Sequence, residues 1–274
     1  MFFAWKKVKA PVFRHKIRAG LWKNKSKRDI VVVEMRRIPL RLLFAVSLAV
    51  ATVLRVEALP EWQIALRDAV MGYTLSADEI RPLYVQATEG ARQSLGGADL
   101  DLSLSRSELL MGQALLDEER NEEARPHFAE GLRLAQKAQE AENSAEAWVL
   151  MAENISRLCQ IGPLGFTMSN GLSVERWAKN ALALDPRNAA AQRLIASRWV
   201  FAPGILGNPR RGIEMMKAIL ENGDMGMDDL FNVYSAIGYG YLQIRRSADA
   251  KPWLLRALEL YPANKFVNKL LVRT

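Results

Sequence analysis

The chain offers few side chains of the kinds that catalyse reactions or bind metal ions. Its 274 residues include one cysteine, Cys159, and two histidines, which excludes a disulfide framework, a cysteine zinc site and a two-histidine metal site in the body of the chain. His127 follows Glu123 by four residues, but a solvent-exposed helical histidine explains this spacing without a metal. Gly238-x-Gly240 lacks the third glycine and the preceding strand of a dinucleotide-binding motif. We therefore expect no catalytic, cofactor-binding or metal-binding residues, and no enzyme.

Charge is distributed unevenly along the chain. There are 38 Lys and Arg against 30 Asp and Glu, a net charge of +8. Residues 1–58 hold 14 of the basic and 3 of the acidic residues, so residues 59–274 carry a net charge of −3. A nucleic-acid-binding domain needs its positive charge on the folded surface. The sequence therefore argues against nucleic acid as a partner.

Residues 35–58 have the three parts of a secretory signal peptide. A basic start, Met35-Arg36-Arg37, precedes the uncharged segment LLFAVSLAVATVL over 42–54, and Val-Glu-Ala at 56–58 supplies small residues where a signal peptidase reads. Thirteen uncharged residues are short for a permanent membrane span, which takes about 20 apolar residues. We predict cleavage after Ala58 and a periplasmic or secreted mature protein.

Residues 1–34 hold ten basic and two acidic residues and would make an unusually long start for a signal peptide. Either they are an extended basic leader, or translation starts at Met35 and they lie upstream of it. The alternatives are a basic cytoplasmic tail before a short membrane anchor, or an organelle transit segment. In each case contact with a membrane is expected only through an uncleaved leader.

The elements that must position any binding residues repeat along 59–274. The 34 residues 231–264 are expected to form two helices. The first has Tyr234, Ile237, Gly238 and Tyr241 on one face. The second has Ala250, Leu254 and Ala257 on one face and is followed by Pro262. Small residues let two antiparallel helices approach closely, and the bulky ones fill the space between them. This pattern resembles the tetratricopeptide repeat (TPR) family of helical hairpins.

The same frame recurs upstream, in 105–138 and in two further stretches, and a partial copy with Tyr84 and Ala87 precedes them. Three copies also share an acidic, apolar, basic, proline order that ends at Pro82, Pro126 and Pro252. Since proline is tolerated in the first turn of a helix, each should mark a helix start. We predict an all-α, TPR-like solenoid of about four helical hairpins over 59–274, preceded by an N-terminal leader.

The resemblance also implies where a partner would bind. TPR arrays bind partners in a groove lined by the first helix of each hairpin. The family register places eight residues of this chain there: Arg106, Gln113, Glu153, Arg157, Arg193, Ser197, Tyr239 and Gln243. The lining lacks the Lys and Asn set that holds acidic chaperone tails in some TPR domains, so an acidic tail is not the expected ligand.

Two connections are longer than a TPR turn and are apolar as well as rich in Gly and Pro. We expect loops at 159–173 and 200–210, with Ser173 and Asn208-Pro209 starting the helices that follow. Apolar side chains in a loop must be buried or contact a ligand. The loops either plug gaps between hairpins or form an apolar lip for a partner, with contacts from Leu164, Phe166, Phe201 and Leu206.

These patterns favour an exported, non-catalytic protein that binds another protein, one of the cell envelope, and mediates assembly there. The alternative is an accessory subunit of a periplasmic uptake system, because the fold is similar to the T-component of TRAP transporters (TatT). That family implies a small or apolar ligand enclosed in a channel. An apolar tunnel between the two loops would favour this alternative.

Overall fold

The computed structural model describes residues 59–202, 207–221 and 225–274, and every element within these ranges is helical. The predicted leader segments 1–34 and 35–58, the cleavage site and Leu206 lie outside the described residues. Eleven helices occupy the described part of the chain: α2 (Glu61–Gly72), α3 (Ala77–Ser94), α4 (Gly97–Asp117), α5 (Asn121–Ala141), α6 (Ala145–Ile161), α7 (Leu164–Leu184), α8 (Ala189–Phe201), α9 (Pro209–Glu221), α10 (Met227–Gln243), α11 (Ser247–Leu260) and α12 (Lys265–Leu271).

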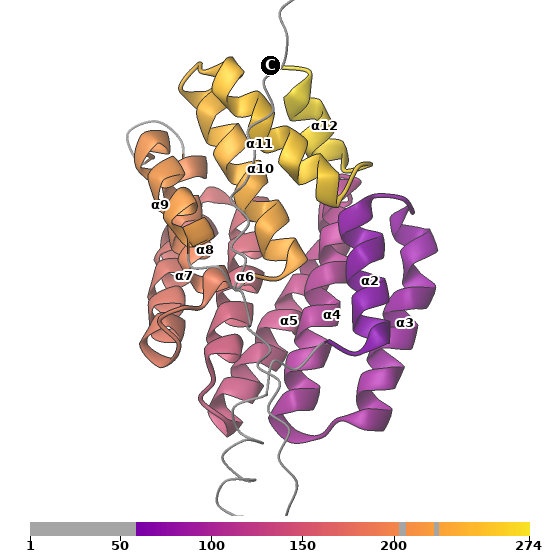
Figure 1. The fold of residues 1–274 in the computed structure, drawn as a ribbon. Helices are drawn as coiled ribbons and strands as arrows, with labels where there is room; N and C mark the ends of the chain where they lie inside the picture. The colour runs from indigo at the N-terminus through magenta and orange to yellow at the C-terminus, as the bar shows by residue number, and fades with distance from the viewer. Residues whose placement is uncertain (1–58, 203–206, 222–224) are drawn as a thin grey trace, which may run out of the picture. The chain divides into compact units, whose positions relative to one another are not determined.

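Successive helices pair as hairpins, and the hairpins stack in chain order (Figure 1). The five pairs run from α2 with α3 to α10 with α11, and α12 packs on the last pair. Even-numbered helices from α2 to α12 contact one another in series, whereas successive odd-numbered helices are at most in marginal contact. The even-numbered helices therefore form the tighter inner layer of a TPR-like solenoid, and the odd-numbered ones the outer layer. This confirms the predicted fold class, with the partial N-terminal copy as the fifth hairpin.

The small residues of the repeat permit the close packing that the sequence predicts. A Cβ atom added at Gly238 of α10 would overlap Leu254 of α11, with its Cγ at 2.7 Å, and would lie 3.5 Å from the carbonyl oxygen of Ala250. Gly112 of α4 faces Phe128 of α5 in the same way, with the ring Cε1 at 2.7 Å. Glycine at these positions sets the distance between the two helices of a hairpin.

Helix caps explain where several helices begin. Ser76 forms a capping box with Glu79, since its hydroxyl accepts from the Glu79 backbone N–H and the Glu79 carboxylate accepts from the Ser76 N–H. Asn208 accepts from the backbone N–H of Arg211 at 3.1 Å, which supports the predicted start of α9. The prolines in the repeated motif are each the sixth residue of their helix, not in the first turn as predicted. In α3 the capping box at Ser76 sets this earlier start, whereas α5 and α11 start at the same distance before the proline without a side-chain cap.

The expected loop at 159–173 is wrong. Helix α6 continues to Ile161 and α7 begins at Leu164, so the two are joined by Gly162 and Pro163 alone. Phe166 packs on Gly162, and the Thr167 hydroxyl donates to the carbonyl of Cys159 at 2.8 Å. The extra residues therefore lengthen α7, where the helix pairs their backbone N–H and C=O groups and Phe166 packs on the core. Ser173 lies inside this helix and starts nothing.

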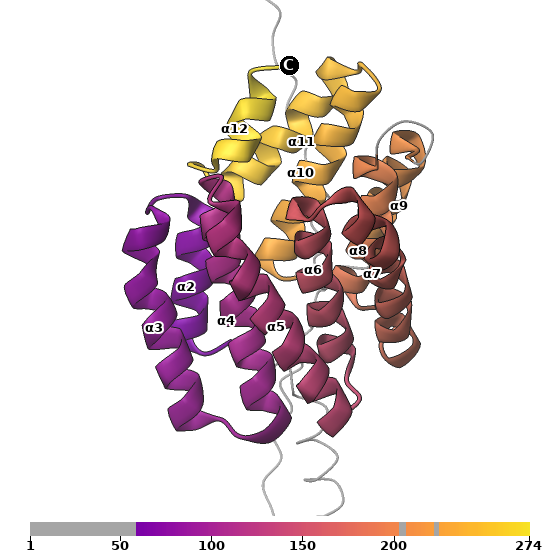
Figure 2. The same ribbon diagram turned by 180° about the vertical axis from the view of Figure 1, so that it is seen from behind.

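The first and last helices of the inner layer, α2 and α12, contact each other. The Asn264 side-chain amide donates to the Met71 carbonyl at 3.2 Å, and Met71 packs on the C-terminal core cluster. The Lys265 ammonium lies 6.0 Å from the ring centroid of Tyr73. Figures 1 and 2 show α12 beside the C-terminal end of α2 in both views. The inner layer is thus closed end to end by contacts between residues that are far apart in sequence.

Candidate functional site

The inner face is the side of the even-numbered helices that points away from the odd-numbered ones, and a row of charged side chains crosses it. Four predicted groove residues belong to this inner row, and four further residues complete it: Gln113, Glu153, Arg157 and Arg193, with Tyr73, Asp117, Asp229 and Lys265. They come from five inner helices and the residue that follows α2. The structure therefore brings half of the predicted groove residues into one connected cluster.

Arg193 is the centre of the row. Its guanidinium forms an ion pair with Glu153 of α6 and a second, at 3.1 Å, with Asp229 of α10. The three side chains are 13–20% exposed. Burial raises the pKa of Asp229, and the positive charge of Arg193 opposes that shift. Burial lowers the pKa of Arg193, but the charges of Glu153 and Asp229 outweigh it and the pKa is raised. Since breaking a buried pair leaves an uncompensated charge, this bridge fixes the spacing of three inner helices.

Asp117 forms the second part of the row. The Gln113 side-chain amide donates to its carboxylate at 2.6 Å. Burial raises the pKa of Asp117, although hydrogen bonds from Tyr73 and Gln113 and the charge of Arg157 act against it. Burial and the Asp117 carboxylate together raise the pKa of Tyr73. Tyr73 has a left-handed backbone with φ of 54°, a costly conformation for a bulky residue that packing must hold in place.

Arg157 lies between the two parts. Burial lowers its pKa, and the charges of Glu153 and Asp117 raise it. Within the described residues no carboxylate oxygen is within 4.0 Å of its guanidinium, which donates instead to the Gln160 side chain at 3.2 Å. An arginine in this position has donor capacity left for a ligand, because guanidinium offers five N–H groups.

Next to the charged row lies a group of aromatic rings from three inner helices, Phe201 of α8, Tyr239 of α10 and Phe266 of α12. We call it the aromatic shelf. Phe201 stacks on Tyr239 with ring centroids 5.0 Å apart and an angle of 20° between planes, and Phe266 lies 6.4 Å from Tyr239. Phe201 and Phe266 are 47% and 41% exposed as residues. Large apolar rings exposed side by side favour a binding surface over a purely structural role.

Other predicted contacts lie elsewhere. Arg106 is on the inner side of α4 but pairs with Glu146, at the start of α6. Ser197 lies one turn after Arg193 on α8, and Gln243 is exposed at the end of α10. Leu164 and Phe166 belong to α7 of the outer layer, with Phe166 packed on the core and Leu164 exposed. These two therefore do not join Phe201 in one apolar lip.

Sequence reasoning missed half of the inner row. Asp117 follows Gln113 by four residues and so lies on the same face of α4, a signal that was available. Asp229 lies in the first turn of α10, where a carboxylate is favourable for the helix whether or not it binds another side chain. Tyr73, Lys265 and Phe266 reach the inner face only because the two ends of the solenoid meet, and no local pattern encodes that contact.

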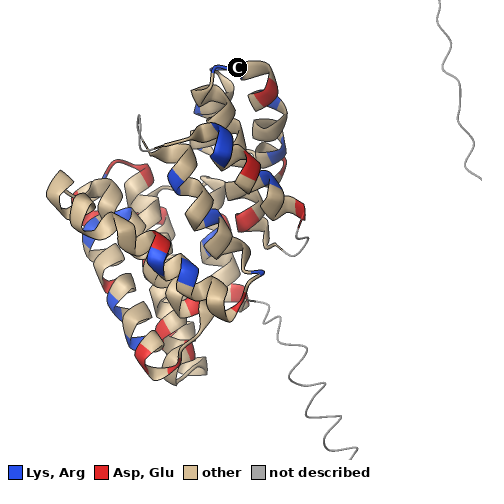
Figure 3. Cartoon of the chain, turned by 90° about the vertical axis from the view of Figure 1, so that its left-hand side faces the viewer, with Lys and Arg blue, Asp and Glu red and all other residues tan. Residues whose placement is uncertain are grey.

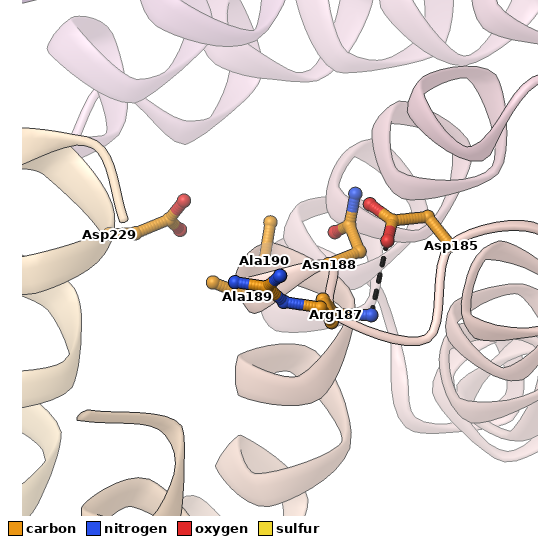
Figure 4. Close-up of a pocket in the computed structure, with 6 residues that line it drawn as sticks. All are labelled: Asp185, Arg187, Asn188, Ala189, Ala190 and Asp229. Atoms are coloured by element: carbon orange, nitrogen blue, oxygen red, sulfur yellow. Dashed lines mark hydrogen bonds between the residues drawn. The ribbon is translucent and has the colours of Figure 1, made fainter. Parts of the chain in front are cut away.

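A polar cavity of about 370 Å³ opens at the start of α8. Figure 4 shows Arg187 between Asp229 on one side and Asp185 on the other, with the first residues of α8 below them. The Arg187 backbone N–H donates to Asp185 at 3.1 Å, and Asn188 caps α8 by accepting from Ala191. Since Asp229 also binds Arg193, the cavity borders the charged row.

His127 is half-buried rather than exposed. Its Nδ1 lies 2.6 Å from the Glu108 carboxylate, whose other oxygen accepts from the Tyr84 hydroxyl at 2.6 Å. This ties α3, α4 and α5 together, and Glu123 is instead bound to Arg120. Over residues 59–202, 207–221 and 225–274, no group of three or more His, Cys, Asp or Glu side chains is placed to hold a metal ion.

Comparisons with known proteins identify no family, but they find similar solved structures. No family model and no curated protein matches the chain. The solved structure of YrrB, described as a TPR protein with an unusual peptide-binding site, has a TM-score of 0.33 and 13% sequence identity over 77% of this chain and 98% of that chain.

Proposed function

We propose that this chain is an exported protein of the cell envelope that binds a segment of another protein on its inner face and carries out no catalysis. The aromatic shelf is the observation that carries the proposal. Phe201 and Phe266 are close to half exposed although apolar side chains of this size are usually buried. A bound peptide would cover both rings.

The charged row supplies the polar part of such a surface. Interfaces commonly place aromatic anchors beside arginines that bind carboxylates or carbonyl oxygens. Arg157 can donate to a backbone carbonyl or a carboxylate, and the buried, unpartnered Oε1 of Gln113 can accept from a backbone N–H of an extended peptide. An acidic tail is not the ligand expected from the sequence, because the groove lacks the Lys and Asn residues that hold such tails in some TPR domains. Arg157 offers a different donor for a carboxylate.

A panel of displayed peptides tests the proposal. Peptides selected on the full chain should lose at least ten-fold in affinity when Phe201 and Phe266 are both changed to Ala. Val85→Ala with Leu255→Ala is the matched control, because these outer-layer residues are 47% and 43% exposed and should not affect binding. Equal affinity for the two double variants would refute binding on the inner face.

The enclosed-ligand alternative has one observation in its favour. The contact between α2 and α12 closes the inner layer end to end, as enclosure of a small ligand requires. The inner row is charged, however, which disfavours an apolar ligand. If no peptide binds and a small molecule raises the melting temperature, the alternative replaces our proposal.

Export has its own test. N-terminal sequencing of the protein recovered from the cell envelope should give a chain that starts at Leu59. A mature chain that starts before Leu42 would rule out cleavage after Ala58.

A further inference from the structure

An apolar stripe on the outer helix α7 is not explained by folding. Leu164, Met168 and Leu172 recur every four residues, so they share one face of the helix, and they are 74%, 74% and 70% exposed. The opposite face of α7 packs on the hydrophobic core through Phe166, Val174 and Trp177. Val174 and Trp177 each contact two separate clusters of buried residues. The first half of α7 is therefore apolar on both faces, and one of them has no partner in the described structure.

A basic hollow continues the stripe toward the C-terminal end of α7. It has a volume of about 420 Å³ and is lined by residues of α7 and α8: Leu172, Glu175, Arg176, Lys179, Asn180 and Arg198. Glu175 accepts from Lys179 at 2.7 Å and also pairs with Arg198, and hydrogen bonds from these two cations lower its pKa. Three cations against one carboxylate leave a net charge of +2 in the hollow. Figure 3 shows the side of the unit on which α7, α8 and α9 lie, with Lys and Arg in blue.

We infer that α7 is a peripheral membrane-contact site for anionic phospholipids. The apolar stripe enters the acyl region of one leaflet, and the phosphate of an anionic lipid is held in the basic hollow. The charge of the hollow is complementary to an anionic headgroup, and its apolar edge at Leu172 joins the two parts. The stripe lies on the outer helix α7, only Arg198 of the hollow comes from the inner helix α8, and the site does not depend on the proposed inner-face function. Interfacial binding of this kind combines apolar burial with attraction between basic side chains and anionic lipids.

Two protein occupants fit the stripe less well. Each stripe residue offers roughly 60–120 Å² of apolar surface, so two copies packed stripe to stripe would bury at most about 700 Å², whereas stable interfaces bury about 1,200–2,000 Å². A partner helix would need a groove. Cβ atoms added at Gly165 and Gly171, on either side of the stripe, would meet no heavy atom within 4 Å, so the stripe is a ridge. A fluid bilayer accepts a ridge without needing a complementary partner surface.

A fluorescent label on the stripe tests the inference in the full chain. Met168→Cys and, as the control, Val272→Cys are made with Cys159→Ala, which removes the only native cysteine. Val272 is 89% exposed near the C-terminus, away from α7. An environment-sensitive dye at position 168 should shift to the blue with vesicles that contain phosphatidylglycerol, and spin-labelled lipid should quench it. Phosphatidylcholine vesicles should give neither effect, and the dye at position 272 should not respond.

The basic hollow is tested by the affinity for the same vesicles. Arg176→Gln, Lys179→Gln and Arg198→Gln should each lower it by about five-fold. Lys251→Gln, Arg256→Gln and Lys269→Gln remove equal charge from exposed sites elsewhere and should leave the dye response unchanged. If the fluorescence of the dye at position 168 does not shift with phosphatidylglycerol vesicles, the inference is overturned. This holds whether the chain binds the vesicles through other residues or does not bind them at all. So does a shift that appears with rising protein concentration and no vesicles, which would indicate protein docking instead.

Discussion

The close approach of α10 and α11 at Gly238 gives the sharpest test of the fold. In Gly238→Ala the new methyl group would overlap the side chain of Leu254, whose Cγ lies 2.7 Å from the position of the added Cβ. Leu254 is fully buried, with 0% of its surface exposed. Overpacking of this kind costs about 1–3 kcal/mol, and the better helix propensity of Ala returns about 1 kcal/mol. Because Leu254 has no free space to move into, we expect a net loss of about 1–2 kcal/mol in the free energy of unfolding.

The same substitution should change sign when Leu254 is shortened. Leu254→Ala alone should cost about 2–5 kcal/mol, since it opens a cavity in the core. In that background the methyl group added at Gly238 meets no side chain and fills part of the cavity. Only the better helix propensity of Ala and the filling of the cavity then contribute, so Gly238→Ala should stabilise the Leu254→Ala variant by about 1 kcal/mol. The coupling energy between the two sites is then about 2–3 kcal/mol.

Urea unfolding followed by circular dichroism gives both quantities, provided that the slope against urea concentration is unchanged. Gly171→Ala is the control, because a Cβ there meets no atom within 4 Å. It should stabilise by about 0.5–1 kcal/mol in both backgrounds. If Gly238→Ala has the same sign with Leu254 and with Ala at position 254, then Leu254 does not limit the approach of α10 to α11, and the reasoning fails.

Three further predictions concern the inner row and one turn. Arg193→Ala should cost about 3–5 kcal/mol at pH 7, because two buried carboxylates lose their cation, and a smaller loss in urea unfolding below pH 4 would identify their charge as the cause. Asp117→Asn should raise the melting temperature at pH 7. Burial raises the pKa of Asp117 in the folded state, so the charged carboxylate destabilises the fold above that pKa. The gain in melting temperature should vanish below pH 3.8, the ordinary pKa of an aspartate. Arg245→Gly should stabilise by about 0.5–1 kcal/mol, since φ is 59° at that turn, and an unchanged urea midpoint would argue against strain there.

The hairpins could be predicted because each is encoded locally. Gly238, Leu254 and Ala257 lie within 20 residues of one another, and their spacing alone indicates two helices that must approach closely. The extension of α7 could not be predicted in this way. Gly162, Pro163, Gly165 and Gly171 are typical of loops, but only the first two break the helix, and Phe166 has a core to pack against. Tertiary burial outweighed the local propensity of these glycines.

The candidate site was predictable to the extent that it follows helix register. The family register assigns Glu153 and Arg193 to the first helices of their hairpins, and the structure has both on inner helices, which contact one another in series. Their pairing depends on how far one hairpin is rotated relative to the next, which no residue pattern within a hairpin specifies. The contact between Asn264 and Met71 is the extreme case, since its partners are 193 residues apart and depend on the accumulated rotation of every hairpin between them.

The difference between the two layers also separates the two proposed binding surfaces. Inner helices touch in series, so a change at Arg193 alters the spacing of its neighbours and is felt along the layer. Outer helices scarcely touch, and the exposed face of α7 can carry apolar residues without disturbing another hairpin. A defect in the inner row should therefore affect stability and binding together. A defect in the stripe at Met168 should affect membrane contact alone, which makes the outer site the one whose function can be measured without a correction for folding.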